Sequence, residues 1–287
     1  MKVDFFIVGA PKSGTTSLYH YLDQHHDISM SIVKEPNYFS AEELKRQELY
    51  YKAKIISEID EYNNLFERKK NNQLLGEASV SYLFYSDVAS KIKLYNPDAK
   101  IIILLRNPVE RAYSHYNMDR RLGYVKEDLT KIINDSSVKN HSLYYQQYIQ
   151  LGQYYTQVKN YIDVFGRDNV CVMLYDHLKE NNKKLTDKVI SFLKLKKYDG
   201  IDYDIPYNSS KNSDFKIVNF LYTLSSLRRL VLMIFPASLL DYLESKFFKN
   251  EKLVMPQDLE RQLYDLYSDE ILLLEKMLNL DLSLWKR

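Results

Sequence analysis

The chain has 287 residues, with 40 Lys and Arg against 38 Asp and Glu, and 45% of its residues are apolar. These values are typical of a folded protein with a large core, and they exclude a disordered or fibrous chain. The formal net charge of +2 gives no reason to expect nucleic-acid binding. The single cysteine, Cys171, excludes an internal disulfide framework and a cysteine-based zinc site.

Apolar segments bear on membranes and on cellular location. The first residues show no basic segment followed by a long apolar stretch and a cleavage site, so we expect no secretory signal and a cytoplasmic location. The longest apolar stretch, Leu230 to Leu240, is too short to span a membrane and contains Pro236. The wider region from Leu227 to Leu243 is predicted to form a buried helix pair broken at this proline, with peripheral contact to a membrane surface as the alternative.

Three short apolar runs predict strands that are buried on both faces: Val3 to Val8, Ile101 to Leu105 and Val170 to Leu174. Each run is followed by a polar turn and a helical pattern. This alternation predicts an α/β domain in which helices flank a central parallel sheet. A weaker strand is expected near Ile28 to Val33.

Helices are predicted from capping residues and from apolar spacing. Asn107-Pro108-Val109-Glu110 follows the second strand and has an N-cap residue, proline at the first helical position and an acid at the third. Apolar and aromatic residues from Tyr144 to Phe165 recur every three or four positions and predict one buried helix face. The same spacing from Leu263 to Leu278 predicts a packing helix, whereas the polar segment from Tyr198 to Asp214 is expected to be a long loop.

The strongest local pattern is the loop Gly9-Ala10-Pro11-Lys12-Ser13-Gly14-Thr15-Thr16, between a buried strand and an amphipathic stretch. A helix N-terminus presents unpaired N–H groups and the positive end of the helix dipole, so this arrangement favours phosphate binding over a glycine turn without a ligand. The two glycines have Walker A spacing. However, Thr15 stands where a nucleoside triphosphatase has lysine, and the cation Lys12 lies inside the loop.

Two further polar residues are predicted to face the same anion. Arg106 directly follows the second buried strand, and Ser114 lies about two helical turns after the Asn107 cap, which returns it to the same side of its helix. A guanidinium and a hydroxyl suit a terminal phosphate monoester. Taken singly, Arg106 would be an ordinary ion-pairing residue, so the prediction depends on their joint spacing.

The chain resembles sulfotransferases that use 3′-phosphoadenosine 5′-phosphosulfate (PAPS). Pro-Lys-Ser-Gly-Thr-Thr from Pro11 resembles their 5′-phosphosulfate-binding loop, and Lys34-Glu35-Pro36-Asn37-Tyr38-Phe39 resembles the Lys-Glu-x-x-x-Phe segment of the heparan-sulfate type of carbohydrate sulfotransferase. The segment from Arg106 to Tyr116 resembles the family's 3′-phosphate-binding strand and helix. Gly152-x-Tyr154 with Phe165-Gly166 resembles its later helix-to-strand unit. The order and spacing of these motifs, over roughly Val3 to Leu195, make the set specific.

The resemblance implies one sulfotransferase domain over residues 1–287, with a core over about 1–195 and a helical portion over about 215–287. It implies that Lys12 and Glu35 are catalytic, the first at the leaving phosphate and the second as the general base for the acceptor. It further implies that PAPS is the donor, that no metal is required, and that the following residues bind the donor: Lys12, Ser13, Gly14, Thr15, Thr16, Arg106 and Ser114.

The sequence departs from the family pattern at two places. Relatives of the heparan type have Gly-Glu-Lys-Ser/Thr, whereas this chain has Gly76-Glu77-Ala78-Ser79, so a cation expected near the acceptor is absent. Either Lys34 or another residue supplies that charge, or acceptor activation depends more on Glu35. A late Lys-Gly-Arg loop is also absent. Asn208 to Lys211 occupies its approximate place, which makes Lys211 a candidate donor contact.

The acceptor is expected to be a glycan or glycan precursor of a bacterium, with a lipid or small metabolite as alternatives. Two other functions compete with sulfuryl transfer. A P-loop nucleotide kinase would need Mg²⁺ and an acidic residue to bind it. At the end of the second strand, where such an acid would be useful, this chain has Arg106. A nucleotide-binding module without catalysis is the other, and the missing lysine at Ala78 keeps that alternative open. His25, His26, His115 and His141 show no metal-ligand spacing, so no metal site is expected.

Overall fold

The computed structural model describes residues 2–49, 55–66, 73–205 and 254–286, and the backbone of 212–213 and 248–249. The predicted donor contact Lys211 and the apolar region from Leu227 to Leu243 lie outside the described residues. The predicted loop from Tyr198 is described as far as residue 205, and over that part it contains no helix or strand.

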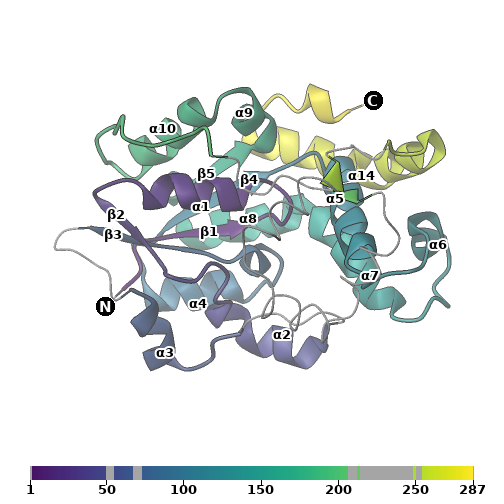
Figure 1. Cartoon of the computed structure of the whole chain (residues 1–287), viewed down its shortest axis with the longest axis horizontal. Helices are drawn as coiled ribbons and strands as arrows, with labels where there is room; N and C mark the ends of the chain where they lie inside the picture. The colour runs from purple at the N-terminus through teal and green to yellow at the C-terminus, as the bar shows by residue number, and fades with distance from the viewer. Residues whose placement is uncertain are drawn as a thin grey trace.

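The centre of the molecule is a five-stranded parallel sheet with the strand order β2-β3-β1-β4-β5 (Figure 1). The strands are β1 (Phe5–Gly9), β2 (Ile28–Met30), β3 (Leu74–Ala78), β4 (Lys100–Leu105) and β5 (Val170–Leu174). The three apolar runs are confirmed as β1, β4 and β5, and the weaker strand as β2. Register places Ile101 of β4 opposite both Phe6 of β1 and Val170 of β5. The predicted α/β fold with a central parallel sheet is therefore confirmed.

Strand β3 was not expected from the sequence, because its five residues include a glycine and a glutamate. Gly76 lies between two large side chains. A Cβ atom there would be 2.2 Å from the Phe5 ring and 2.5 Å from the Met30 sulfur, so only glycine fits without a shift of its neighbours. Glu77, which follows it, is fully buried. Both residues interrupt the apolar run that makes the other strands recognisable.

Helices cover both faces of the sheet (Figure 1). The side chains of Phe5 and Ile7 point to one face, where they share a core cluster with α1 (Thr15–Asp23), α9 (Tyr175–Glu180) and α10 (Asn182–Phe192). The other face is covered by longer elements. Phe6 and Val8 point there, toward α4 (Val88–Tyr95), α5 (Pro108–Arg121), α8 (Tyr154–Phe165) and α14 (Gln257–Leu278).

Shorter elements complete the described fold. They are α2 (Ala41–Gln47), α3 (Ile59–Asn63), α6 (Leu129–Asn134), α7 (His141–Tyr148) and a two-stranded antiparallel ladder of β6 (Asn212–Ser213) and β7 (Phe248–Lys249). Single 3₁₀ turns occur at Tyr38–Ser40, Asn64–Phe66, Val80–Leu83, Gln150–Gly152, Arg167–Asn169 and Ser283–Trp285.

The prediction of one helix face from Tyr144 to Phe165 was wrong, because the segment forms two helices, α7 and α8. The break includes the turn Gln150–Gly152. A Cβ at Gly152 would lie 2.8 Å from the Tyr267 hydroxyl, whose single proton is shared between the carbonyls of Tyr148 and Ile149, at 3.1 and 2.9 Å. Tyr267, together with Arg111, thus provides donors for carbonyls at the end of the helix. The break allows α7 to pack against α5, while α8 packs on the sheet.

The C-terminal packing helix is confirmed as α14, in which Leu263, Tyr267 and Ile271 are buried. Beyond it, the only tryptophan of the chain, Trp285, is almost fully buried. Its indole N–H donates to the Asp176 carboxylate of α9 at 3.1 Å, and its ring centroid lies 6.2 Å from that of Tyr154. The end of the described chain therefore packs against α8 and is hydrogen-bonded to α9.

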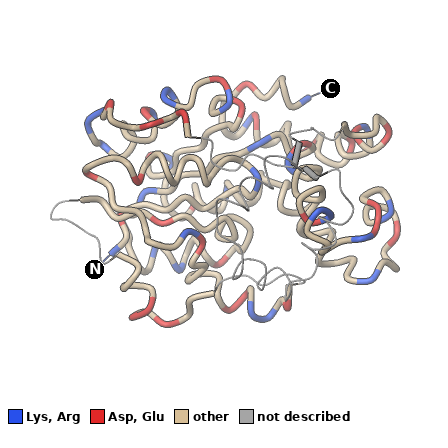
Figure 2. Tube along the Cα trace, viewed as in Figure 1, with Lys and Arg blue, Asp and Glu red and all other residues tan. Residues whose placement is uncertain are grey.

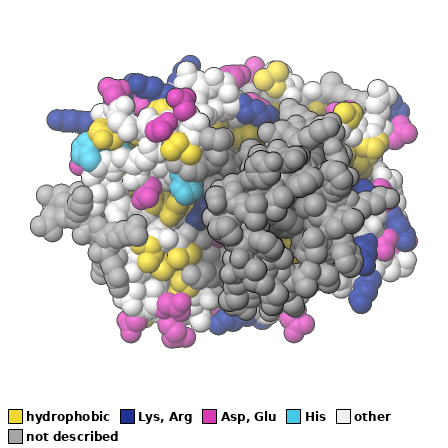
Figure 3. Space-filling model, in the orientation of Figure 1, with side chains coloured by type: hydrophobic (Ala, Val, Ile, Leu, Met, Phe, Trp, Pro, Cys, Tyr) yellow, Lys and Arg dark blue, Asp and Glu magenta, His cyan; other side chains and the backbone are white. Residues whose placement is uncertain are grey.

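The described surface mixes charges and apolar groups. Basic and acidic residues are interspersed over the trace in Figure 2, in keeping with the small net charge. On the face drawn in Figure 3, hydrophobic side chains form small groups separated by polar and charged ones. Among the described residues, no helix is both long and apolar enough to cross a membrane.

Candidate active site

The carboxyl ends of β1, β2, β3 and β4 open into one cavity of about 690 Å³. The chain proceeds from β1 to β2 and β3 on one side and then crosses to β4 on the other. In open α/β sheets such a reversal of strand order is where ligands bind. The structure brings these predicted site residues together in the cavity wall: Lys12, Gly14, Thr15, Thr16, Glu35, Arg106 and Ser114. Ser13 is fully buried and is not among the lining residues.

The loop between β1 and α1 has the predicted strand–loop–helix geometry. Gly14 precedes α1 with a φ of 85°, in the left-handed region that favours glycine. A Cβ there would lie 2.6 Å from Leu178 and 2.9 Å from Tyr175, so α9 approaches too closely for any side chain at this position. Thr15 and Thr16 form the first turn of α1 and line the cavity. A helix start in a cavity wall is the arrangement that favours anion binding.

Lys12 is a partly desolvated cation in the cavity wall. Burial, together with the nearby charges of Arg121 and Arg106, lowers its pKa to about 8, although Asp119 and Glu35 act in the opposite direction. Its ammonium lies 3.1 Å from the Met118 sulfur, a weak acceptor. A bound anion would supply the charge compensation that this ammonium lacks.

Arg106 is held in place before any ligand binds. Its guanidinium donates to the Glu110 carboxylate through Nε at 3.1 Å and Nη2 at 2.8 Å, and to the Lys12 carbonyl at 3.3 Å. The Tyr175 ring lies 5.0 Å from the same guanidinium. The pair with Glu110 was not predicted, although a spacing of four residues near a helix start is a recognisable signal.

The start of α5 is confirmed at Pro108. The Asn107 side chain accepts a hydrogen bond from the Val109 N–H at 3.0 Å and so caps the helix. This cap fixes which side chains of α5 face the cavity. Ser114 lines it, and so do Met118 and Arg121, which follow at helical spacing. The face of α5 that holds Ser114 therefore contributes a further cation, Arg121, which was not predicted from the sequence.

Glu35 lies at the cavity rim in a constrained conformation. Its φ is 60°, and its N–H donates to the Ala78 carbonyl at 2.8 Å, at the end of β3. Its carboxylate is 40% exposed and forms an ion pair with Lys34, whose side chain is only 18% exposed. Lys34 also lines the cavity, so it both contacts the carboxylate and adds positive charge there.

Ala78, where heparan-type relatives have lysine, is fully buried. Its side chain belongs to the apolar cluster that includes Ile7, Leu18 and Tyr19, on the α1 face of the sheet. It does not line the cavity. In this chain Lys34, and not residue 78, is therefore the cation beside the candidate base.

We expect Ala78→Lys to lower the free energy of unfolding by about 3 kcal/mol, because it places an unpaired ammonium in an apolar cluster. Urea unfolding at pH 7 measures the change. Leu94→Lys is the matched control, since Leu94 is 88% exposed and its replacement should change little. Unchanged stability together with faster turnover would show instead that a lysine at 78 reaches the cavity.

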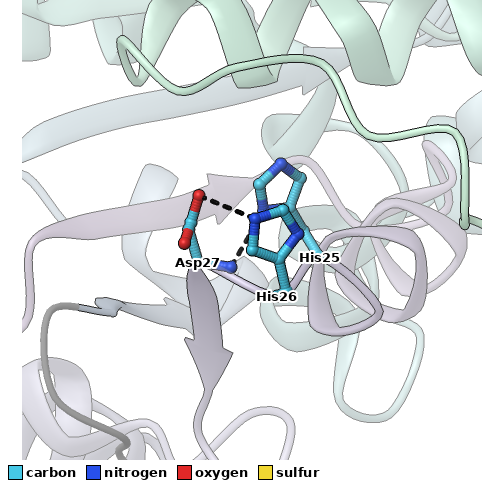
Figure 4. Close-up of side chains that lie close together, drawn as sticks. All are labelled: His25, His26 and Asp27. Carbon is cyan, nitrogen blue, oxygen red and sulfur yellow. Dashed lines mark hydrogen bonds and ion pairs between the residues drawn. The ribbon is translucent and has the colours of Figure 1, made fainter.

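Three neighbouring residues, His25, His26 and Asp27, offer possible metal ligands within 4.8 Å of one another (Figure 4). The contacts of His25 argue against this use. Its Nδ1 accepts from the Asp27 N–H at 3.1 Å, and its Nε2 lies 3.0 Å from the Lys196 carbonyl oxygen. Since a carbonyl only accepts, Nε2 carries the proton and neither nitrogen is free for a metal. These contacts are those of a structural histidine.

The cavity wall also includes Asp119 and Gln147, which were not predicted, and His115, of which the sequence predicted only that it does not bind a metal. Asp119 is 2% exposed and accepts from the Tyr148 hydroxyl at 3.0 Å. Burial, with Arg111 and Lys12 nearby, lowers the pKa of His115 well below its usual value, so this ring is neutral at pH 7. Gln147 of α7 lies against the same ring through its carbonyl oxygen. These contacts depend on the packing of α7 on α5, which no local pattern reveals.

Comparison with known proteins supports the assignment drawn from the motifs. Mouse carbohydrate sulfotransferase 15 is 25% identical over 243 residues, which cover 67% of this chain and 43% of that protein. Human bifunctional heparan sulfate N-deacetylase/N-sulfotransferase 1 is 29% identical over 219 residues, covering 73% of this chain and 23% of that protein. The chain thus spans less than half the length of these curated relatives.

Solved structures share the fold. A sulfotransferase from Alicyclobacillus acidocaldarius is 29% identical, with a TM-score of 0.72 and coverage of 100% of both chains. A mouse sulfotransferase in complex with PAP, only 15% identical, has a TM-score of 0.53 over 94% of this chain and 84% of its own, which shows likeness of fold alone. A model of the sulfotransferase domain matches residues 2–225. With this match over most of its length, the chain belongs to the sulfotransferase domain family.

Proposed function

We propose that the protein transfers a sulfuryl group from PAPS to a hydroxyl or amine of a saccharide. One observation carries this proposal: a single cavity is lined by the glycine loop with Lys12, by Arg106 with Ser114, and by the carboxylate of Glu35. These groups match the three tasks of the reaction, which are to hold the donor at both of its phosphates and to deprotonate the acceptor.

The residues of the cavity fit the donor. Lys12 and the first-turn N–H groups of Thr15 and Thr16 in α1 would hold the 5′-phosphosulfate, because a partly desolvated cation lies beside the positive end of a helix. Arg106 and Ser114 would hold the 3′-phosphate, for which Arg106 must exchange part of its contact with Glu110. When bound, PAPS supplies an activated sulfuryl group. Lys12 would then neutralise the negative charge that develops on the leaving phosphate.

Glu35 would accept the proton of the attacking hydroxyl or amine. Its carboxylate is partly exposed at the cavity rim, where an acceptor can approach it. The ion pair with Lys34 holds the carboxylate in one orientation at the rim, as the positioning of a general base requires. The buried Ala78 leaves this pair as the acid–base centre of the cavity.

The cavity lining supports a saccharide acceptor. Beside apolar residues such as Leu44 and Phe84, it includes hydroxyl and amide side chains, among them Tyr85, Tyr124, Gln146 and Gln147. Such groups donate and accept hydrogen bonds, as a hydroxyl-rich substrate requires. The names of the curated relatives, carbohydrate and heparan sulfate sulfotransferases, support the same acceptor class.

Mass spectrometry of candidate acceptors tests the proposal. The protein is incubated with PAPS and, separately, with oligosaccharides, a phenol and a lipid alcohol. A mass increase of one SO₃ on a saccharide is expected, both with and without a metal chelator. An increase on the lipid or phenol alone would overturn the acceptor class. Phosphoryl transfer from ATP that needs Mg²⁺ would support a kinase instead, and nucleotide binding without any product would indicate a module without catalysis.

We expect adenosine 3′,5′-bisphosphate to raise the midpoint of thermal unfolding more than AMP at equal concentration, since only the bisphosphate engages Arg106 and Ser114. Arg106→Ala should weaken bisphosphate binding by roughly tenfold to a hundredfold, the loss expected for a charge-assisted contact. Arg120→Ala on the same helix is the control, because Arg120 does not line the cavity. Equal shifts with AMP and with the bisphosphate would remove the role assigned to Arg106.

A further inference from the structure

A buried carboxylate lies beneath the segment that carries Glu35. Glu77 of β3 is fully buried and accepts three hydrogen bonds: from Ser79 Oγ at 2.6 Å, from the Tyr62 hydroxyl at 2.7 Å and from the Tyr82 hydroxyl at 3.3 Å. Among the described residues, no cation forms an ion pair with it. A buried carboxylate without a counter-ion is costly, so its retention in the core calls for a reason.

The contacts of Glu77 continue to the candidate base. Ser79 Oγ, which donates to Glu77, accepts the Asn37 N–H at 3.1 Å. The side-chain Nδ2 of Asn37 donates to the Glu35 carbonyl at 2.9 Å, and the side-chain Oδ1 of Asn37 accepts from Ser81 Oγ at 2.7 Å. Asn37 is thus fixed on both sides, and the chain of contacts runs from Glu77 through Ser79 and Asn37 to the backbone of Glu35.

The segment needs this support because its backbone is strained. Glu35 has a φ of 60° and Asn37 a φ of 56°. The left-handed conformation costs roughly 1–2 kcal/mol for a residue with a side chain, although asparagine tolerates it better than glutamate does. Such a conformation persists only where the surroundings over-determine it, and strained residues gather at functional sites. Removing one anchor should therefore allow the Glu35 segment to relax.

We propose that Glu77 is a positioning residue for Glu35, and that it acts by fixing the hydroxyl of Ser79, the acceptor that holds the Asn37 N–H. This inference rests on the proposed role of Glu35 as the general base. Ser79 has one hydroxyl proton, which it donates to Glu77, so its lone pairs remain directed at Asn37. The negative charge of Glu77 also polarises this hydroxyl and strengthens its oxygen as an acceptor.

The protonation of Glu77 should then affect turnover. Burial raises its pKa to about 7, even though its hydrogen bonds from Ser79, Tyr62 and Tyr82 act to lower it. The other groups that face it are also hydroxyls, those of Tyr95 on α4 and Tyr161 on α8, and burial raises the pKa of each of these tyrosines. They stay neutral near pH 7. Below pH 7 a protonated Glu77 becomes a donor, which disturbs Ser79, so turnover should fall.

The test compares Glu77→Gln, Ser79→Ala and the double variant. Each single variant should lower kcat for sulfuryl transfer by roughly tenfold to a hundredfold, the range for a displaced catalytic group, with unchanged affinity for adenosine 3′,5′-bisphosphate. The double variant should lose no more than the larger single loss, because both changes break one chain of contacts. Glu77→Gln should also lack the fall in kcat below pH 7.

Stability separates positioning from folding. The folded-state pKa of Glu77 is raised, so the neutral carboxyl stabilises the fold at low pH and this contribution is lost as pH rises through about 7. Glu77→Gln should therefore unfold at the same or a higher temperature than the parent at pH 8, while its kcat is reduced. If it unfolds more easily, Ser79→Ala carries the test alone.

Three outcomes overturn the proposal. The first is full kcat in both Glu77→Gln and Ser79→Ala, and the second is a double variant in which the two losses of kcat add. The third is a loss of affinity for adenosine 3′,5′-bisphosphate in either single variant. A lower kcat without a change in the pH profile overturns the ionised carboxylate as the active form. Failure of the underlying function is recognised separately. If Glu35→Gln retains kcat, Glu35 is not the base, whereas an inactive Glu35→Gln beside a fully active Glu77→Gln removes only the positioning role.

Discussion

Glu35→Gln should lower kcat by roughly 10² to 10⁴ while the affinity for adenosine 3′,5′-bisphosphate remains unchanged. Glutamine has the same length and can occupy the same backbone conformation, but it cannot accept a proton. The side chain is 40% exposed, and the amide oxygen of glutamine can still accept a hydrogen bond from Lys34, so the replacement removes the charge and keeps a contact. Single-turnover measurements with saturating PAPS isolate the sulfuryl transfer from product release.

Glu42→Gln is the matched control for this variant, because Glu42 is a nearby carboxylate at 80% exposure and does not line the cavity. Its kcat should equal that of the parent. Loss of bisphosphate binding in Glu35→Gln would indicate that the carboxylate supports the fold of the cavity. Retention of kcat would assign proton transfer to another group, and Asp119 is the other carboxylate among the lining residues.

Lys12→Met should lower kcat/KM by roughly 10² to 10³, the loss expected when a donor to the developing charge is removed. The thermal stability of Lys12→Met without nucleotide should not fall along with its activity. The folded-state pKa of Lys12 is lowered to about 8, so between about pH 8 and 10.5 the unfolded chain binds more protons and stability rises with pH. Below pH 8 the ammonium therefore opposes folding. Lys12→Met should unfold at the same or a higher temperature at pH 7.

The advantage in stability of Lys12→Met should vanish above about pH 10.5, where the lysine is neutral in both states. Thermal unfolding across this pH range provides the measurement. Lys183→Met is the control, since Lys183 is an exposed lysine outside the cavity and its replacement should leave turnover intact. A Lys12→Met variant that is less stable but fully active would show that the lysine serves the loop structure and not the donor.

The sheet was predictable where hydrophobic burial alone decides it. Strands β1, β4 and β5 are buried over nearly their whole length, so continuous apolar runs identify them. Strand β3 was not predicted, because the reasons for its glycine and its glutamate lie outside its five residues. Gly76 packs between two large side chains of other strands, and Glu77 accepts hydrogen bonds from the hydroxyls of Tyr62 and Tyr82. The break between α7 and α8 was not predicted for a similar reason. The apolar spacing continues across it, and only contact with Tyr267 explains Gly152.

The candidate site was predictable to the extent that strand ends define it. In a parallel sheet, residues that follow neighbouring strands meet at one edge, which is why the loop after β1 and Arg106 after β4 share the cavity. Contacts between elements distant in sequence were not predictable. The chain of hydrogen bonds from Glu77 to Glu35 joins residues 42 positions apart, and the contribution of Gln147 depends on how α7 packs.

The position of Trp285 provides a built-in optical probe. Because the chain has a single tryptophan, its intrinsic fluorescence under selective excitation comes from one place. That indole donates a hydrogen bond to Asp176. The preceding residue, Tyr175, lines the cavity, and its ring lies against the Arg106 guanidinium. Tyr154, which packs beside the indole, donates its hydroxyl to the Arg106 carbonyl at 3.0 Å. If the cavity binds the nucleotide as proposed, we expect binding to change the emission of the native chain, which would report occupancy without an attached dye.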